Sequence, residues 1–193
     1  MLLQTRLRAV ALIFFVAGIV FVIRDLLDQS SVSPVVEIAL VAGLGFTAAL
    51  LWSGRFCTLI QLRVVELAIF GSIAAFLAAQ DYHLVYAEVI QGNGGLVLGR
   101  SVHALLHYAV LVAAYGIFIP NTWQRAAVLI GPMALTPLAT GLLLNGLHPE
   151  FLEVASEVGF AARITDPILL LMVSVVIAVY GTHVIHQFRS EAF

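Results

Sequence analysis

The chain has 193 residues, of which 62% are hydrophobic and only 10% are charged, and its mean hydropathy is +1.06. Soluble domains are usually about half apolar and about a quarter charged, so this composition excludes a water-soluble protein and indicates an integral membrane protein. All nine basic residues are Arg. Because Lys is absent, a Walker-type phosphate loop, a protein kinase site and a pyridoxal or retinal Schiff base are excluded. The net charge of −2 argues against nucleic acid as a partner.

Six apolar segments are long enough, or nearly so, to cross a bilayer, which takes roughly 20 residues. In chain order they are Leu7–Ile23, Val35–Trp52, Val64–Ala79, Val102–Ile119, Ala126–Leu144 and Ile168–Ile185. The third segment is short for a span, and Leu59 is an alternative start. The sequence therefore predicts one all-α integral membrane domain over residues 1–193, with six transmembrane helices in contact with the lipid bilayer.

The distribution of Arg predicts the orientation of these helices, because cytoplasmic loops retain positive charge. With the N-terminus inside, the inner ends of the spans hold Arg6, Arg8, Arg55, Arg63, Arg125 and Arg189, and the outer ends hold Arg24, Arg100 and Arg163. The acidic residues lie mostly at the outer ends. We therefore expect both termini in the cytoplasm. Glu37 and Glu66 lie near span ends and are expected to be interfacial rather than part of a transport path.

Small residues and prolines give cues to helix packing. Gly71, Ala75 and Ala79 recur at every fourth position of the third span, and such a stripe lets helix backbones approach closely. Pro132 and Pro137 interrupt the fifth span and predict bends, because each removes a backbone hydrogen bond. Ordinary packing is favoured over a moving hinge for both features.

Two outer segments connect the spans. Residues 80–100 are expected to form the longest loop, with a flexible Gly-rich centre. Residues after the fifth span predict a short amphipathic helix on the outer membrane surface. Its acidic face holds Glu150, Glu153 and Glu157, and its apolar face holds Phe151, Val154 and Val158.

Histidines are the only plausible ligand set. His103 and His107 lie four residues apart, so both project from one helix face, and either is a candidate axial ligand for a haem or a bacteriochlorophyll. The pair His183 and His186 lies near the opposite membrane face and cannot share that cofactor. An outer-face metal site or pH sensor would combine His83 and His148 with nearby carboxylates. Interfacial histidines satisfied by hydrogen bonds are favoured over all of these, so no cofactor is predicted.

Catalytic signatures are missing from the sequence. His103 and His107 have zincin spacing but lack the Glu that would act as the base. A Gly-x-Ser-x-Gly elbow is also missing. The chain is therefore expected not to be an enzyme.

Four stretches of the sequence resemble a known group of proteins. They begin at Leu7 (LRAVALI), Leu62 (LRVVELAIFG), Tyr115 (YGIFIPNTWQRAA) and Tyr180 (YGTHVIHQFRSEAF). Together they resemble the six-helix membrane region that precedes the catalytic domain in bacterial, planctomycete-like receptor-type serine/threonine kinases. The most specific stretch contains Pro120, Asn121, Thr122, Trp123 and Arg125 and is expected at the inner face.

The resemblance implies a location in the bacterial cytoplasmic (inner) membrane and a module without catalysis of its own. In that group, the last span leads directly into a cytoplasmic kinase domain, which would begin where this chain stops at Phe193. Gln124, Val184 and Ser190 replace expected basic residues, so the inner surface is less basic than in the group. The first interpretation is a sensory or anchoring module. The alternatives are a structural subunit of a larger respiratory or photosynthetic membrane complex and a tetrapyrrole-binding protein.

Overall fold

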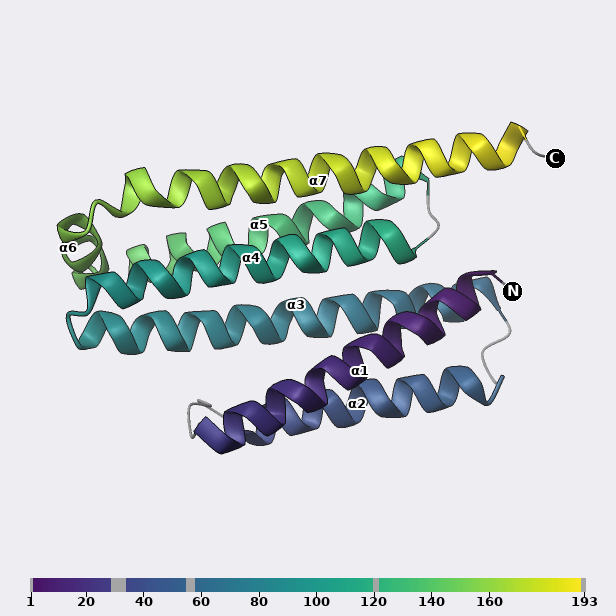
Figure 1. Cartoon of the computed structure of the whole chain (residues 1–193), viewed down its shortest axis with the longest axis horizontal. Coiled ribbons are helices and arrows are strands. Elements are labelled where there is room, and N and C mark those ends of the chain that lie inside the picture. The colour runs from purple at the N-terminus through teal and green to yellow at the C-terminus, as the bar shows by residue number, and fades with distance from the viewer. Residues whose placement is uncertain (1, 29–33, 55–57, 120–121, 192–193) are drawn as a thin grey trace. The chain divides into compact units, whose positions relative to one another are not determined.

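The computed structural model describes residues 2–28, 34–54, 58–119 and 122–191. These residues form seven α-helices and no strand (Figure 1). The helices are α1 (Leu2–Asp28), α2 (Pro34–Trp52), α3 (Leu59–Ile90), α4 (Gly94–Phe118), α5 (Trp123–Leu147), α6 (Glu150–Glu157) and α7 (Phe160–Glu191). All except α6 are long and apolar enough to cross a membrane, which confirms the predicted all-α architecture with six candidate spans.

The contacts divide the chain into two compact units, Met1–Phe76 and Leu77–Phe193. Helix α3 contributes its first part to unit 1 and its second part to unit 2. Both units consist mainly of apolar helices. The expected single membrane domain over residues 1–193 stays a prediction.

In unit 1, α1 packs along α2 through reciprocal glycine contacts. A Cβ on Gly18 of α1 would lie 2.6 Å from Val41 Cγ2 of α2. A Cβ on Gly45 of α2 would lie 2.6 Å from Phe15 Cε2 of α1. Each helix thus has a glycine where a large side chain of the other enters, which is how small residues bring membrane helices together.

Polar and aromatic contacts complete unit 1. Arg8 Nε donates a 2.9 Å hydrogen bond to the carbonyl of Leu51, so the start of α1 caps the last turn of α2. The rings of Phe14 and Phe70 meet edge to face at 5.8 Å and join α1 to the first part of α3.

In unit 2, α4 lies beside both α7 and α5, and α6 lies across one end of these helices (Figure 1). A Cβ on Gly116 of α4 would be 2.8 Å from Ala178 Cα of α7, so only glycine permits this approach of the two backbones. We call the end that carries α6 the α6 end of unit 2.

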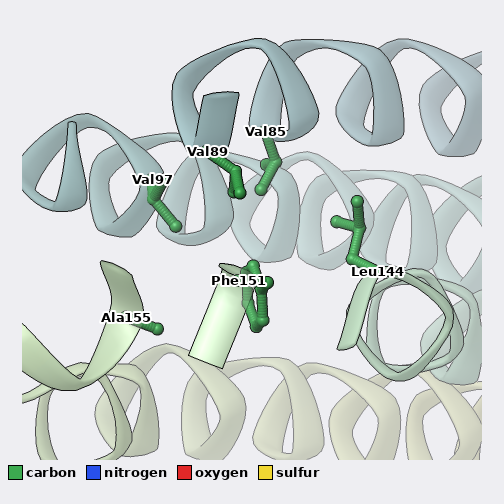
Figure 2. Packing of buried hydrophobic residues seen from close by; sticks show 6 residues of the cluster. All are labelled: Val85, Val89, Val97, Leu144, Phe151 and Ala155. Carbon is green, nitrogen blue, oxygen red and sulfur yellow. The ribbon is translucent and has the colours of Figure 1, made fainter. Parts of the chain in front are cut away.

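An apolar cluster holds the α6 end together (Figure 2). It consists of Val85, Val89, Val97, Leu144, Phe151 and Ala155, all buried. Helix α6 contributes its apolar face to this cluster, while its acidic residues are exposed. The predicted short amphipathic helix is therefore confirmed as a helix.

The expected long loop over residues 80–100 is wrong, because α3 continues to Ile90 and α4 begins at Gly94. Gly92 adopts the left-handed conformation (φ 69°). Its N–H bonds to the carbonyl of Val89, and the N–H of Asn93 bonds to the carbonyl of Glu88. These two bonds form a Schellman motif, which satisfies the end of α3 and turns the chain within three residues. Gly92 thus ends a helix and does not lie in the centre of a long, flexible loop.

The predicted packing stripe lies on an exposed face of α3. Gly71, Ala75 and Ala79 are exposed, and a Cβ on Gly71 would meet no atom within 4 Å. Close packing at this stripe therefore has no counterpart among the described residues and stays a prediction. Helix α5 runs through Pro132 and Pro137 without ending, and bends at these prolines also stay predictions.

Candidate functional site

A buried carboxylate lies in the part of α3 that belongs to unit 2. Asp81 is only 9% exposed, and its Oδ2 atom accepts no hydrogen bond within the described part of the chain. It shares one face of α3 with Val85 and Val89, four and eight residues later, whose side chains form the apolar cluster at the α6 end. Burying a carboxylate oxygen that has no hydrogen-bond partner costs free energy, so a functional reason for Asp81 at this position is expected.

Next to Asp81, a tyrosine–histidine contact joins α3 to the end of α5. The Tyr82 hydroxyl and His148 Nε2 form a 2.9 Å hydrogen bond. The ring of Tyr86, one turn further along α3, lies over the His148 imidazole with a centroid distance of 4.1 Å. His148 is held in place by its own backbone, because its N–H bonds to Leu144 and its carbonyl accepts from Phe151 at the start of α6.

Further buried polar groups of unit 2 lie on α4 and α5. Tyr108 of α4 is fully buried, interacts electrostatically with Asp81 and forms a hydrogen bond with Thr136 of α5. Asn145 of α5 lies one turn before His148, and its Oδ1 atom is buried without a hydrogen bond in the described chain. We call Asp81, Tyr82, Tyr108, Asn145 and His148 the polar cluster of unit 2.

The polar cluster has two buried acceptor oxygens, Asp81 Oδ2 and Asn145 Oδ1, and neither accepts a hydrogen bond within the described part of the chain. Two such oxygens are satisfied by a proton on the carboxyl group, by a water molecule or by a small cation. The cluster therefore has the chemistry of a site that takes up a positively charged or proton-donating species.

Unit 1 contains a buried acid of a different kind. Glu66 is fully buried, and its Oε2 atom lies 2.6 Å from Arg63 Nη1, one turn earlier on α3. Glu37, at the start of α2, is also buried, at 7% exposure. The expectation that Glu37 and Glu66 are interfacial did not anticipate this burial within the helices.

The four candidate ligand histidines form two pairs, because His83 and His148 both contact the Tyr82 ring and His103 lies beside His107. His148 belongs to the polar cluster, whereas His83 is exposed on α3 and meets the Tyr82 ring edge to face at 5.8 Å. His103 and His107 are exposed on α4, with ring centroids 6.4 Å apart and planes at 23°. Within the described residues, no three His, Cys, Asp or Glu side chains gather to hold a metal, and the combined site of His83, His148 and carboxylates stays a prediction.

The inner-face motif is described only in part. Thr122 is the N-cap of α5, and Trp123 begins the helix with its side chain 48% exposed. Arg125 is exposed in the first turn of α5. Pro120 and Asn121 lie outside the described residues. His183 lies in α7, and the side chain of His186 is not among those described.

Sequence reasoning missed most of the polar cluster. The sequence analysis places Asp81, Tyr82 and Tyr86 in a loop, Tyr108 inside the fourth predicted span, and Asn145 just beyond the end of the fifth. The four-residue spacing of Asp81, Val85 and Val89 is a helical signal that predicts a continuation of α3 and places the acid on its buried face. No protein family, curated protein or solved structure matches the chain.

Proposed function

We propose that the chain is a non-catalytic, six-span module of the bacterial cytoplasmic membrane, of the sensory or anchoring kind. Six helices of sufficient length and hydropathy support membrane insertion. The excess of Arg at one set of span ends supports cytoplasmic termini. The resemblance to the membrane region of bacterial receptor kinases supports a role that precedes catalysis instead of performing it.

The observation that carries a sensory role is the buried, unpartnered oxygen of Asp81. Ionisable side chains inside a membrane-crossing helix are rare because they cost free energy, and they mark functional sites. Asp81 gives the module a group whose charge changes when it gains a proton or a small cation.

Occupancy of Asp81 can be transmitted through contacts that link α3 to α4 and α5. Asp81 of α3 interacts with Tyr108 of α4, which forms a hydrogen bond with Thr136 of α5. The Tyr82–His148 bond, made by the next residue of α3, holds α3 to the end of α5. A change in the charge of Asp81 alters which of these groups it attracts, and that alters the relative stability of two arrangements of α5. Pro132 and Pro137 lower the cost of bending in that helix.

Infrared difference spectroscopy of the protein in lipid vesicles tests this role. We expect a carboxyl band that changes when pH or sodium concentration is changed and that is missing in Asp81→Asn. A Glu37→Gln variant is the control and should keep the band. A spectrum in which Asp81→Asn removes no responsive band contradicts the proposal.

A second candidate function is that of a structural subunit in a larger membrane complex, which would place other membrane proteins around this chain. It is favoured by the exposure of two spans, because only 11% of the apolar stretch of α7 and only 17% of that of α5 are buried by the chain itself. Purification from native membranes in mild detergent distinguishes the two. Stoichiometric copurification with a complex favours the subunit, and isolation of the chain alone or joined to a kinase domain favours the sensor.

A further inference from the structure

Two histidines lie on an exposed face of a helix that is apolar enough to cross a membrane. His103 and His107 of α4 are both exposed, and their near-parallel rings stack at 6.4 Å. Ionisable side chains in membrane spans almost always face the protein interior. An outward pair therefore indicates that something other than lipid covers this face.

The depth of the pair follows from the length of α4. Its 25 residues extend about 37 Å, so about 7 Å of the helix lies beyond a ~30 Å hydrocarbon core. Arg100 is 43% exposed, and an exposed Arg on a spanning helix is expected near the end of the hydrocarbon core. His103 lies about 4.5 Å further along the axis and His107 about 10 Å further, so the pair is expected from this boundary inward.

The surroundings of the pair select the type of ligand. The neighbouring exposed side chains Leu106 and Val110 are apolar, and no third ligand group gathers there within the described chain. A bare divalent cation held by two neutral imidazoles would keep its full charge in an apolar medium, which is strongly unfavourable. A tetrapyrrole dianion cancels that charge, supplies four nitrogen ligands and leaves one axial position for an imidazole.

We propose that His103 is the axial ligand of a metal tetrapyrrole that lies flat on the exposed face of α4. In the described structure, His103 has its ring contact with His107 and no hydrogen bond, so its coordinating nitrogen is accessible. Side chains on an α-helix lean towards its N-terminus, so His103 covers the turn of Gly99, where an added Cβ would meet nothing within 4 Å. That open turn accommodates the macrocycle.

Two neighbours fit the same ligand. The ring of His107 is nearly parallel to that of His103, with the centroids 6.4 Å apart, and we assign it the role of orienting the His103 imidazole as a positioning residue. Arg100, one turn before His103, has only a long 3.8 Å ion pair with Glu88. Its guanidinium can pair with the acidic substituents that many tetrapyrroles carry at their edge.

Titration of the purified full chain with zinc protoporphyrin, haemin and metal-free protoporphyrin tests the proposal by absorption spectroscopy. We expect both metal complexes to bind with a spectrum of imidazole ligation, whereas the metal-free compound gives no such shift. His103→Leu should abolish the shift, and His107→Leu should weaken affinity roughly 10–100-fold, as loss of an orienting contact does at metal sites. The exposed His83 provides the matched control, and His83→Leu should bind normally.

Two glycine variants separate ligation from non-specific adsorption. Gly99→Leu keeps both histidines and fills the space beside His103, so it should block binding. Gly95→Leu makes the same change one turn further away, at another glycine with open space, and should leave binding intact. Equal binding of metal-free protoporphyrin, or an imidazole-ligated spectrum that persists in His103→Leu, overturns the proposal. Binding of bare zinc with no binding of the porphyrins overturns it as well.

Discussion

The hydroxyl of Tyr82 lies 2.9 Å from Nε2 of His148, and this bond joins the buried face of α3 to the point where α5 ends and α6 begins. Tyr82 directly follows Asp81 on α3, and the Oδ2 atom of Asp81 has no hydrogen bond in the described chain. A buried carboxylate with an unsatisfied oxygen is therefore next in sequence to the residue that joins α3 to the α5–α6 junction.

Removing the Tyr82 hydroxyl should loosen this junction. Tyr82→Phe loses one hydrogen bond between partly buried groups and should lower the free energy of unfolding by about 1 kcal/mol. Tyr86→Phe keeps the ring that lies over His148 and should stay within about 0.5 kcal/mol of wild type. Denaturation of both variants in the same detergent measures the difference, and equal stability of the two would mean that the hydrogen bond contributes nothing.

Two of the buried acids, Asp81 and Glu66, should respond oppositely to replacement by Leu. Asp81→Leu removes an unsatisfied buried oxygen and should stabilise the protein by about 1–3 kcal/mol. Glu66→Leu breaks the ion pair with Arg63 and should destabilise it by roughly 1–3 kcal/mol, less than a fully buried pair would lose because Arg63 is 22% exposed. Thermal unfolding in detergent measures both. Loss of stability in Asp81→Leu would contradict the view that the buried oxygen of Asp81 is unsatisfied.

The start of α4 should accept no side chain larger than hydrogen. A Cβ on Gly94 would lie 2.7 Å from the backbone oxygen of Val154 in α6, which cannot rotate away. Gly94→Ala should therefore cost about 1–3 kcal/mol and expose the α6 backbone to hydrogen exchange. The adjacent Gly95 meets nothing within 4 Å, so Gly95→Ala should be neutral or stabilising by up to about 1 kcal/mol. Similar exchange in both variants would contradict the packing of α6 on α4.

The proposed orientation makes different cysteines accessible from each side of the membrane. Cys57, the only cysteine, falls in an expected cytoplasmic connection, so a membrane-impermeant maleimide should label it only after permeabilisation. Gln91→Cys combined with Cys57→Ser places the thiol in the connection between α3 and α4 and should be labelled in intact cells. Labelling of Cys57 in intact cells, with Gln91→Cys labelled only after permeabilisation, would indicate the opposite topology.

The number of long helices could be predicted from hydropathy and from the turn residues between the apolar segments, because six such segments correspond to six long helices. Helix lengths could not, since hydropathy falls where Asp81, His83 and Glu88 occur, although the helix continues. The glycines after Ile90 gave two opposite possibilities, a flexible loop or a helix stop, and the backbone bonds of Gly92 and Asn93 decide for the stop.

The candidate site was harder to predict because it depends on contacts between helices. The pairing of Tyr82 with His148 joins positions 66 residues apart, and no local pattern encodes it. His103 and His107 were recognised as sharing one face from their spacing alone. Only the structure shows that this face is exposed.

The most direct test of the sensory proposal is hydrogen exchange of α5 and α6 in lipid vesicles, measured before and after a change in pH or sodium concentration. If Asp81 is the responding group, wild-type protein should change its exchange at the end of α5 and in α6, and Asp81→Asn should not change. Glu37→Gln should behave as wild type. An unchanged wild-type pattern, or an equal response in Asp81→Asn, would contradict the proposal.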